Sequence, residues 1–210
     1  ETEGLARFAF EFMDECGDAP FFLCLSPQQP HWGLGADGTP RRMAPERFYP
    51  QLPEPFAFPA NVRAEAVARA PETPASLQGG ARNHCAMILA LDEMLGAVMD
   101  YLDRTGRADN TLLVFTSDHG TQAGAHGSPF WQKKRPYEES LRVPCVARLP
   151  GVLEAGATRD ALMAPVDFFP TLCGLCGIRS PRSVEGLDLS AAWRGAPATP
   201  GQDALFCMNF

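Results

Sequence analysis

A carboxylate and an imidazole stand directly after an apolar run. Residues 112–116 read Leu-Leu-Val-Phe-Thr, and Ser117, Asp118, His119 and Gly120 follow. Such a run is typical of a buried strand, which would place Asp118 and His119 at the strand's carboxyl end, where ligands bind in open α/β sheets. A carboxylate there suits a divalent cation that stabilises oxygen charge. Alternatively, Asp118 caps the next segment and His119 is an ordinary loop histidine.

Further polar residues that could take part in such chemistry lie in two loops. His126, Lys133 and Lys134 follow the same strand, and His31 follows a second apolar run at residues 21–25. Taken alone, each has an ordinary explanation, because loop lysines are usually solvated and a loop histidine beside an aromatic residue is often simply packed. The residue types leave both explanations open.

Three helices are predicted around these loops from the spacing of apolar residues. The first covers residues 2–15, the second covers 82–105 and ends at Gly106, and the third starts near Ala164 with Pro170 in its first turn. The first helix presents Leu5, Phe8, Ala9 and Phe12 at helical spacing. The second presents a stripe of Ile88, Leu91, Leu95, Val98 and Leu102, with Met87, Met94 and Met99 beside it as core filling and Asp92 on its apolar side.

Strands are predicted near Phe21–Ser26, Leu112–Ser117 and Pro144–Arg148. Placed in one sheet and flanked by the helices, they give an α/β fold. Residues 39–81 contain eight of the 20 prolines, which rules out regular structure over much of this stretch. We interpret it as a loop excursion that either contributes to a binding pocket or is a surface feature of no consequence.

Composition excludes several classes of partner. The chain has 210 residues, 45% of them hydrophobic, and a net charge of -7 with scattered basic residues. This is the composition of an ordinary globular protein, and it argues against nucleic-acid and membrane partners. The first residue is Glu1, and no signal peptide or membrane span opens the chain, so we expect a piece of a longer protein whose compartment the sequence does not reveal.

The seven cysteines are odd in number, and several lie in apolar runs. This pattern predicts buried free thiols rather than a disulfide framework, and it leans toward a cytoplasmic location. Cys173 and Cys176 have redox spacing, but they lie in what reads as a packed helix. We interpret them as core residues, with thiol–disulfide chemistry as the alternative.

The order of motifs along the chain resembles the sulfatase family of the alkaline phosphatase superfamily. The matching motifs are Ser-Asp-His-Gly at 117–120, His-Gly at 126–127, Pro-Tyr-Glu-Glu-Ser at 136–140, Arg-Val-Pro at 142–144, Pro-Gly at 150–151, Val-Asp-Phe-Phe-Pro-Thr-Leu at 166–172 and Gly-Leu-Asp-Leu at 186–189. The resemblance extends from about Phe21 to Phe210, with residues 39–81 poorly covered. It implies an alkaline-phosphatase-like sheet flanked by helices.

The resemblance also implies roles for the site residues. Asp118 and His119 correspond to metal ligands, and Lys133 corresponds to the lysine that contacts the ester oxygens. His31 falls on the histidine that contacts the sulfate ester and could protonate the leaving group, and His126 could orient the site. The implied metal is Ca²⁺, although imidazole matches it poorly, which leaves Mn²⁺ open.

The nucleophile of such an enzyme is not encoded in these 210 residues. Related sulfatases convert Cys or Ser in Cys/Ser-x-Pro/Ala-x-Arg to formylglycine, preceded by an Asp-Asp pair that binds metal. Only residues 190–194, Ser-Ala-Ala-Trp-Arg, satisfy the pattern, and they fall in a structural segment of the family, so we reject Ser190. We therefore expect the N-terminal part of the fold to be absent from this chain.

These observations lead to a functional hypothesis. The chain is interpreted as a partial sulfatase catalytic domain over residues 1–210, with a loop excursion at 39–81 and the start of a C-terminal subdomain at 182–210. Its substrate would be a small-molecule or carbohydrate sulfate ester. The alternatives are a phosphodiester or phosphonate monoester hydrolase of the same superfamily, and a non-catalytic protein that binds sulfated or phosphorylated ligands. The oligomeric state stays open.

Overall fold

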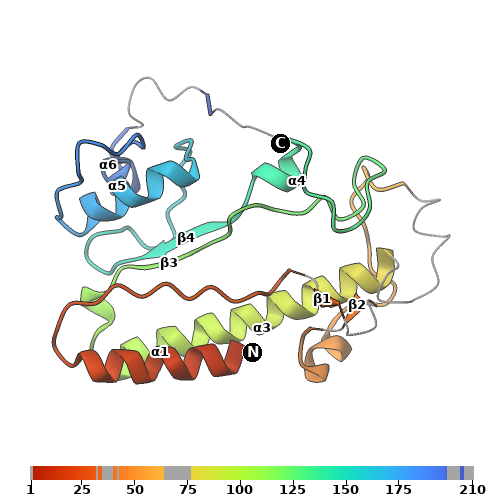
Figure 1. The fold of residues 1–210 in the computed structure, drawn as a ribbon, viewed down its shortest axis with the longest axis horizontal. Helices are drawn as coiled ribbons and strands as arrows, with labels where there is room; N and C mark the ends of the chain where they lie inside the picture. The colour runs from red at the N-terminus through yellow and green to blue at the C-terminus, as the bar shows by residue number, and fades with distance from the viewer. Residues whose placement is uncertain are drawn as a thin grey trace. The chain divides into compact units, whose positions relative to one another are not determined.

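The computed structural model describes residues 2–31, 33–34, 40–41, 43–63, 77–197 and 204–205. The chain divides into two units, whose elements are labelled in Figure 1. Unit 1 comprises Glu1–Arg104 and Gly120–Leu141, and unit 2 comprises Thr105–His119 and Arg142–Phe210. Within the described ranges, no helix has the length and apolarity that crossing a bilayer requires.

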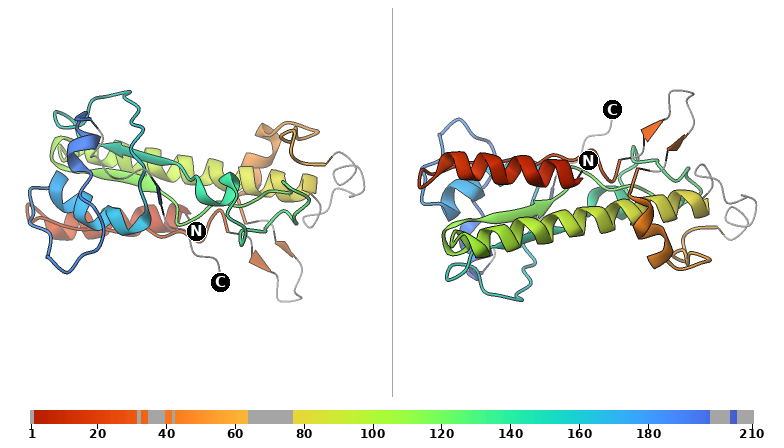
Figure 2. Two further views of the ribbon diagram at one scale, coloured as in Figure 1. Left: turned by 90° about the horizontal axis from the view of Figure 1, so that it is seen from above. Right: turned by 90° about the horizontal axis from the view of Figure 1, so that it is seen from below.

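Two helices, α1 (Thr2–Cys16) and α3 (Leu77–Arg104), form the centre of unit 1. They lie side by side in Figures 1 and 2 and run in the same direction. Phe10 stacks on Tyr101 with ring centroids 4.5 Å apart, and the Tyr101 hydroxyl donates to the Asp14 carboxylate. The side chains that α1 buries are Thr2, Ala6, Ala9 and Met13. Small side chains at this contact let the helices approach closely.

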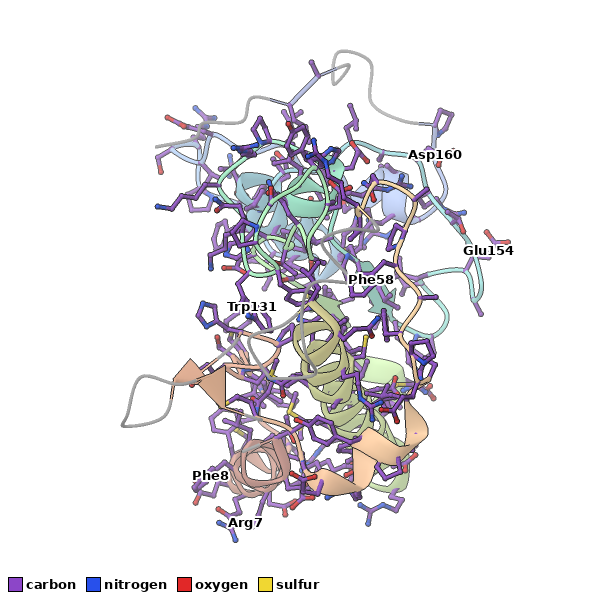
Figure 3. The ribbon with its side chains drawn as sticks, turned by 90° about the vertical axis from the view of Figure 1, so that its right-hand side faces the viewer. Arg7, Phe8, Phe58, Trp131, Glu154 and Asp160 are labelled. Carbon is purple, nitrogen blue, oxygen red and sulfur yellow. The ribbon has the colours of Figure 1, made fainter. Side chains whose placement is uncertain are left out.

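The prediction of the first helix is confirmed, but the face it was expected to bury is wrong in part. Phe8 and Phe12 are exposed, and Figure 3 shows Arg7 and Phe8 projecting outward from α1. The reason is that the contact with α3 is made by another face of α1, which carries Ala6, Phe10 and Met13, so the stripe that carries Phe8 and Phe12 stays outside. Spacing alone identifies a helix, whereas its buried face depends on the partner.

Helix α3 begins five residues before the predicted start at Arg82 and ends where expected, because Gly106 adopts a left-handed conformation with φ +70°. Met87 and Met94 are buried, which confirms their role in the core. Leu91, Val98 and Leu102 are buried as predicted, whereas Ile88 and Asp92 are exposed.

The buried face of α3 differs from the predicted stripe because the helix contacts two elements at once. One core cluster joins Leu91 and Met94 to α1, and another joins Ala86, Met87 and Ala90 to the segment around η1 (Glu46–Gln51). These two contacts shift the buried face toward positions 86, 87 and 90 and leave position 88 outside.

The segment expected to be an excursion is tied to α3 by buried amide side chains. Asn83 Oδ1 accepts hydrogen bonds from the Tyr49 hydroxyl at 2.7 Å and from the Met43 backbone N–H at 3.2 Å. Gln78 both accepts from and donates to the Phe56 backbone, at 2.9 and 3.1 Å. Before α3 begins at Leu77, the described part of this segment contains η1, an isolated bridge at Val62 and β2 (Pro40–Arg41), which pairs with β1 (Gly33–Leu34) just upstream.

The predicted strand near Phe21–Ser26 is wrong as a strand. Residues 21–28 are extended, and their side chains alternate between half-buried and exposed, which is the period of a strand. Among the described residues, however, no second strand pairs with them, and a strand exists only where a neighbour completes its hydrogen-bond ladder. The sequence predicted the local conformation but not the missing partner.

Unit 2 contains the strand that ends at the Asp-His pair. After η2 (Ala108–Asn110), β3 (Leu113–Thr116) pairs antiparallel with β4 (Cys145–Arg148), with Leu113 opposite Arg148 and Thr116 opposite Cys145. Both predicted strands are thus confirmed, each shorter than expected, but β3 is half-buried rather than buried as the apolar run indicated.

Two helices of unit 2, α5 (Pro165–Leu175) and α6 (Ser190–Trp193), pack against each other. Pro165 occupies the first turn of α5, so the expectation that Pro170 lies there is wrong; Pro170 is inside the helix. Proline at the first turn is favoured because the missing N–H has no helical partner there. The Val166 carbonyl, left without the Pro170 N–H, faces Gly186, where a Cβ would be 1.9 Å from its oxygen.

Candidate active site

Asp118 and His119 lie just beyond β3 in unit 2, as predicted. The Asp118 side chain is 82% exposed and that of His119 is 41% exposed, with Asp118 Oδ2 3.3 Å from His119 Nε2. Asp118 Oδ1 accepts the His119 backbone N–H at 3.0 Å. This local hydrogen bond fixes the turn while most of the carboxylate stays exposed to solvent, so local capping and ligand binding can coexist.

These two side chains can provide only part of a metal site. Ca²⁺ takes roughly six to eight oxygen ligands, whereas one carboxylate and one imidazole are adjacent here. Over the described residues, no group of three or more His, Cys, Asp or Glu side chains is arranged to hold a metal ion. The exposed carboxylate fits a divalent cation in charge and donor type, and the remaining ligands would have to come from elsewhere.

His126 is held by three contacts within unit 1, and its carboxylate partner is held by a fourth. Its backbone N–H donates to the Asn61 carbonyl at 3.1 Å, and its ring stacks on Tyr137 with centroids 3.8 Å apart and planes 20° apart. Its Nε2 is 3.2 Å from Glu139 Oε2, and Glu139 Oε1 accepts from Asn61 Nδ2 at 2.5 Å. His126 has φ +57°, a left-handed conformation that is costly for a residue with a side chain, so the surrounding contacts must hold it.

Glu139 is the second residue of the short helix α4 (Glu138–Leu141). A hydrogen bond from its own backbone N–H lowers the pKa of Glu139, and the hydrogen bonds with Asn61 and His126 lower it further. The carboxylate is therefore charged near neutral pH. Gly120 approaches this turn closely, because its N–H donates to the Ser140 carbonyl at 2.8 Å and a Cβ would be 2.0 Å from the Glu139 carbonyl oxygen.

The two candidate lysines differ in their surroundings. Lys133 is half-buried and Lys134 is exposed, while both backbone N–H groups donate to Gln132 Oε1, at 3.0 and 3.3 Å. The loop that carries them is closed by backbone hydrogen bonds from Gln122 to Gln132 at 2.7 Å and from Ala123 to Phe130 at 2.9 Å. These bonds fix the loop backbone without forming a regular strand pair.

His31 is exposed, and its backbone N–H donates to the Gln28 carbonyl at 2.8 Å. The adjacent Trp32, against which it could pack, lies outside the described residues. Lys133, His31 and His126 thus belong to unit 1, whereas Asp118 and His119 belong to unit 2.

Another histidine, His84 on α3, contacts two loops of unit 1, the one that carries His31 and the one that carries Lys133. Its ring lies 5.9 Å from the rings of Phe130 and Trp131, and it hydrogen-bonds to the Pro30 backbone, which can only accept. Burial lowers the pKa of His84, and the bond to Pro30 opposes this only in part. Its Nδ1 is buried without a hydrogen-bond partner.

Sequence reasoning missed Glu139, Asn61 and His84 as supporting residues. Glu139 lies in the Pro-Tyr-Glu-Glu-Ser motif, which carries the family resemblance but does not by itself indicate a histidine partner. Asn61 lies in the proline-rich segment and His84 in a helix, where nothing in the residue pattern indicates a contact with a distant loop.

The six described cysteines are free thiols as predicted, but the prediction that they are buried is wrong, because none of the six is fully buried. Cys24, Cys145 and Cys176 are exposed, and Cys16, Cys85 and Cys173 are half-buried. Cys176 ends α5 and therefore faces outward rather than into the core. Cys207 lies outside the described residues.

Comparison with known proteins decides the family. The sulfatase family model matches residues 1–178. The chain belongs to the sulfatase family. This sulfatase chain is 33% identical over 190 residues to an ulvan-active sulfatase of Formosa agariphila, covering 90% of this chain and 34% of the relative. It is 37% identical over 119 residues to an N-acetylglucosamine-6-O-sulfatase of Bacteroides thetaiotaomicron, covering 57% of this chain and 21% of that protein.

A solved structure supports the fold of the sulfatase chain. The crystal structure of yidJ from Bacteroides fragilis matches with a TM-score of 0.73 and 27% identity, covering 93% of this chain and 41% of that one. The α/β, alkaline-phosphatase-like fold predicted from the sequence is confirmed. The sulfatase chain spans about a third or less of the curated relatives that it matches, 34% and 21% of their lengths.

The rejected Ser190 of the sulfatase chain is buried, and its neighbourhood is structural. Ser190 begins α6, and its backbone N–H donates to Asp188 Oδ1 at 2.8 Å. This environment agrees with the interpretation of residues 190–194 as a turn and helix rather than a nucleophile motif.

Proposed function

We propose that this chain supplies the metal-ligating and charge-stabilising half of a sulfatase active site that hydrolyses a sulfate ester on a carbohydrate. The observation that carries the proposal is the open Asp118 carboxylate beside His119 at the end of β3, in a chain of the sulfatase family. Of the two relatives compared above, one is named an N-acetylglucosamine-6-O-sulfatase and the other an ulvan-active sulfatase, and the first name supports a carbohydrate substrate.

Each candidate residue has a role that follows from its chemistry. Asp118 and His119 would hold a divalent cation, Ca²⁺ or, because of the imidazole, Mn²⁺. Such a cation supplies charge that stabilises oxygen anions and positions the nucleophile. Lys133 would neutralise the non-bridging oxygens of the ester, and His31 would donate a proton or hydrogen bond to the leaving oxygen.

The nucleophile is proposed to lie in sequence that precedes residue 1. The formylglycine pattern and the Asp-Asp pair expected by resemblance are not found in these 210 residues, apart from the rejected match at Ser190. The match covers only 34% of the length of the ulvan-active sulfatase, so the rest of such a protein could contain the formylglycine pattern and the Asp-Asp pair. We therefore expect the 210-residue chain alone to hydrolyse no ester.

The test compares this chain with a longer protein that includes the upstream sequence. Both are assayed on matched aryl and carbohydrate sulfates, on a phosphodiester and on a phosphonate monoester. The proposal predicts turnover of sulfate esters by the longer protein only. Preference for the phosphorus esters would favour the phosphodiester or phosphonate alternative, and binding without turnover would favour the non-catalytic one.

Metal retention tests the assignment of Asp118 without relying on activity. In the longer protein, Asp118→Ala should abolish metal retention, because it removes a charge and an oxygen ligand, and His119→Ala should weaken it less. Elemental analysis of dialysed protein measures the occupancy. Full occupancy in Asp118→Ala would remove this residue from the site, and Asp160→Ala, on an exposed loop, is the matched control.

A further inference from the structure

The His126 imidazole has one paired nitrogen and one open nitrogen. Nε2 faces the Glu139 carboxylate at 3.2 Å, whereas Nδ1 makes no hydrogen bond within the described residues. The side chain is 34% exposed, and Tyr137 covers one face of the ring at 3.8 Å. The ring is thus partly accessible to a ligand, and turning it over would break its hydrogen bond with Glu139.

The carboxylate decides which nitrogen carries the proton. A neutral imidazole has one donor and one acceptor nitrogen, and an ionised carboxylate can only accept. The low pKa of Glu139 keeps it ionised at neutral pH. Nε2 must then carry the proton and donate it to Glu139, which leaves Nδ1 as an acceptor.

The same carboxylate is itself held in place. Glu139 Oε1 accepts from the Asn61 side chain at 2.5 Å, and the Asn61 carbonyl accepts from the His126 backbone at 3.1 Å. Asn61 thus binds both members of the pair, and the adjacent Val62 forms a bridge with Ala125, next to His126. The segment 61–62 therefore fixes both the ring's carboxylate partner and the backbone that carries the ring.

We propose that Glu139, held by Asn61, is a positioning residue that fixes His126 with its proton on Nε2, so that Nδ1 accepts a hydrogen bond from a hydroxyl group of the substrate. This inference rests on the proposed function, since a carbohydrate sulfate offers hydroxyls beside its ester. The expected ligand group is a neutral donor, because an ester oxygen cannot donate to Nδ1.

The first test observes the tautomer directly and requires no activity. Long-range ¹⁵N–¹H correlation spectra of the 210-residue chain, recorded well above the usual pKa of histidine, distinguish the two tautomers of its four histidines. His126→Gln assigns the His126 signal. We expect the Nε2–H tautomer in the wild type, a mixture of tautomers in Glu139→Gln, and no change in the exposed control Glu15→Gln.

An Nδ1–H tautomer in the wild type, or an unchanged tautomer in Glu139→Gln, would overturn the inference. An Nδ1–H tautomer in the wild type overturns the inference even if Glu139→Gln does not fold. The control Glu15→Gln removes one negative charge, as Glu139→Gln does, but at a position away from His126.

The second test uses the longer protein and a carbohydrate sulfate. Glu139→Gln should raise KM about tenfold and leave kcat nearly unchanged, because one hydrogen bond to the bound substrate is weakened. Equal KM values in Glu139→Gln and the wild type would overturn the substrate-binding role. If the longer protein hydrolyses no sulfate ester while the tautomer is as expected, the proposed function fails and the positioning by Glu139 stands.

Discussion

Two segments carry motifs of the sulfatase family: Ala164 to Arg194 in unit 2 and Gly120 to Leu141 in unit 1. The polar side chains compared here are buried and hydrogen-bonded in the first segment and partly exposed in the second. Asp167 is 3% exposed, and its two oxygens accept the backbone N–H groups of Ala164 and Leu187, both at 2.8 Å. In the other segment, His126 is 34% exposed and keeps an open nitrogen.

This difference separates structural motifs from chemical ones. Thr171 is completely buried, and its hydroxyl donates to the Leu187 carbonyl at 3.3 Å and accepts from the Leu189 N–H at 3.0 Å. A polar group whose partners are all supplied by its own chain has nothing left to offer a ligand. A half-exposed group fixed on one side only is available for chemistry.

The largest effect on stability is expected from Asp167→Ala. The substitution leaves two N–H groups without their charged acceptor, which should lower the free energy of unfolding by about 2–4 kcal/mol. Urea unfolding of the 210-residue chain, followed by tryptophan fluorescence, measures the loss. The exposed Asp160→Ala, with Asp160 on the loop of unit 2 labelled in Figure 3, should stay within about 0.5 kcal/mol of the wild type. Equal losses in both variants would contradict the structural role of Asp167.

A smaller loss is expected from Thr171→Val, which keeps the shape and removes the hydroxyl. The carbonyl of Leu187 and the N–H of the buried Leu189 lose a partner, so the free energy of unfolding should fall by about 1–2 kcal/mol. The same urea experiment applies, with the exposed Thr158→Val as control. A stability equal to that of the control would show that water or backbone movement replaces the hydroxyl.

The smallest effect is expected from His84→Gln, which should change only how the free energy of unfolding depends on pH. Because burial lowers the pKa of folded His84, the unfolded chain binds the proton more readily. The stability that neutral His84 contributes is complete above about pH 6.5, the usual histidine value, and is lost as pH falls toward the lower folded pKa. Unfolding free energies measured across this window should fall less steeply in His84→Gln than in the wild type. Parallel curves would contradict the assignment.

The sequence could predict the fold class and most element positions because both follow from local patterns. Gly106 ends α3 as expected, and the apolar run before Asp118 forms β3. The buried faces could not be predicted, because whether Phe8 or Ala6 faces inward depends on the surface of α3. For the same reason, the extended segment 21–28 could not be recognised as lacking a partner among the described residues.

The candidate site could be predicted at the level of residue types but not of contacts. Asp118 and His119 are neighbours in the chain, so their proximity was implied by the sequence. The pairing of His126 with Glu139 and Asn61 joins segments 78 positions apart, and no local pattern encodes it. The roles of His31, Lys133 and His126 in catalysis stay predictions.

The central claim is that the segment 120–141 performs chemistry, and paired kinetics on its two lysines test it most directly. In the longer protein, Lys133→Ala should lower kcat/KM for a sulfate ester by about 100-fold or more, because it removes one group that stabilises charge in the transition state. Lys134→Ala, the matched control on the exposed neighbour, should change little. The reverse order would move the role to Lys134, and two near-normal enzymes would contradict the claim that this segment takes part in catalysis.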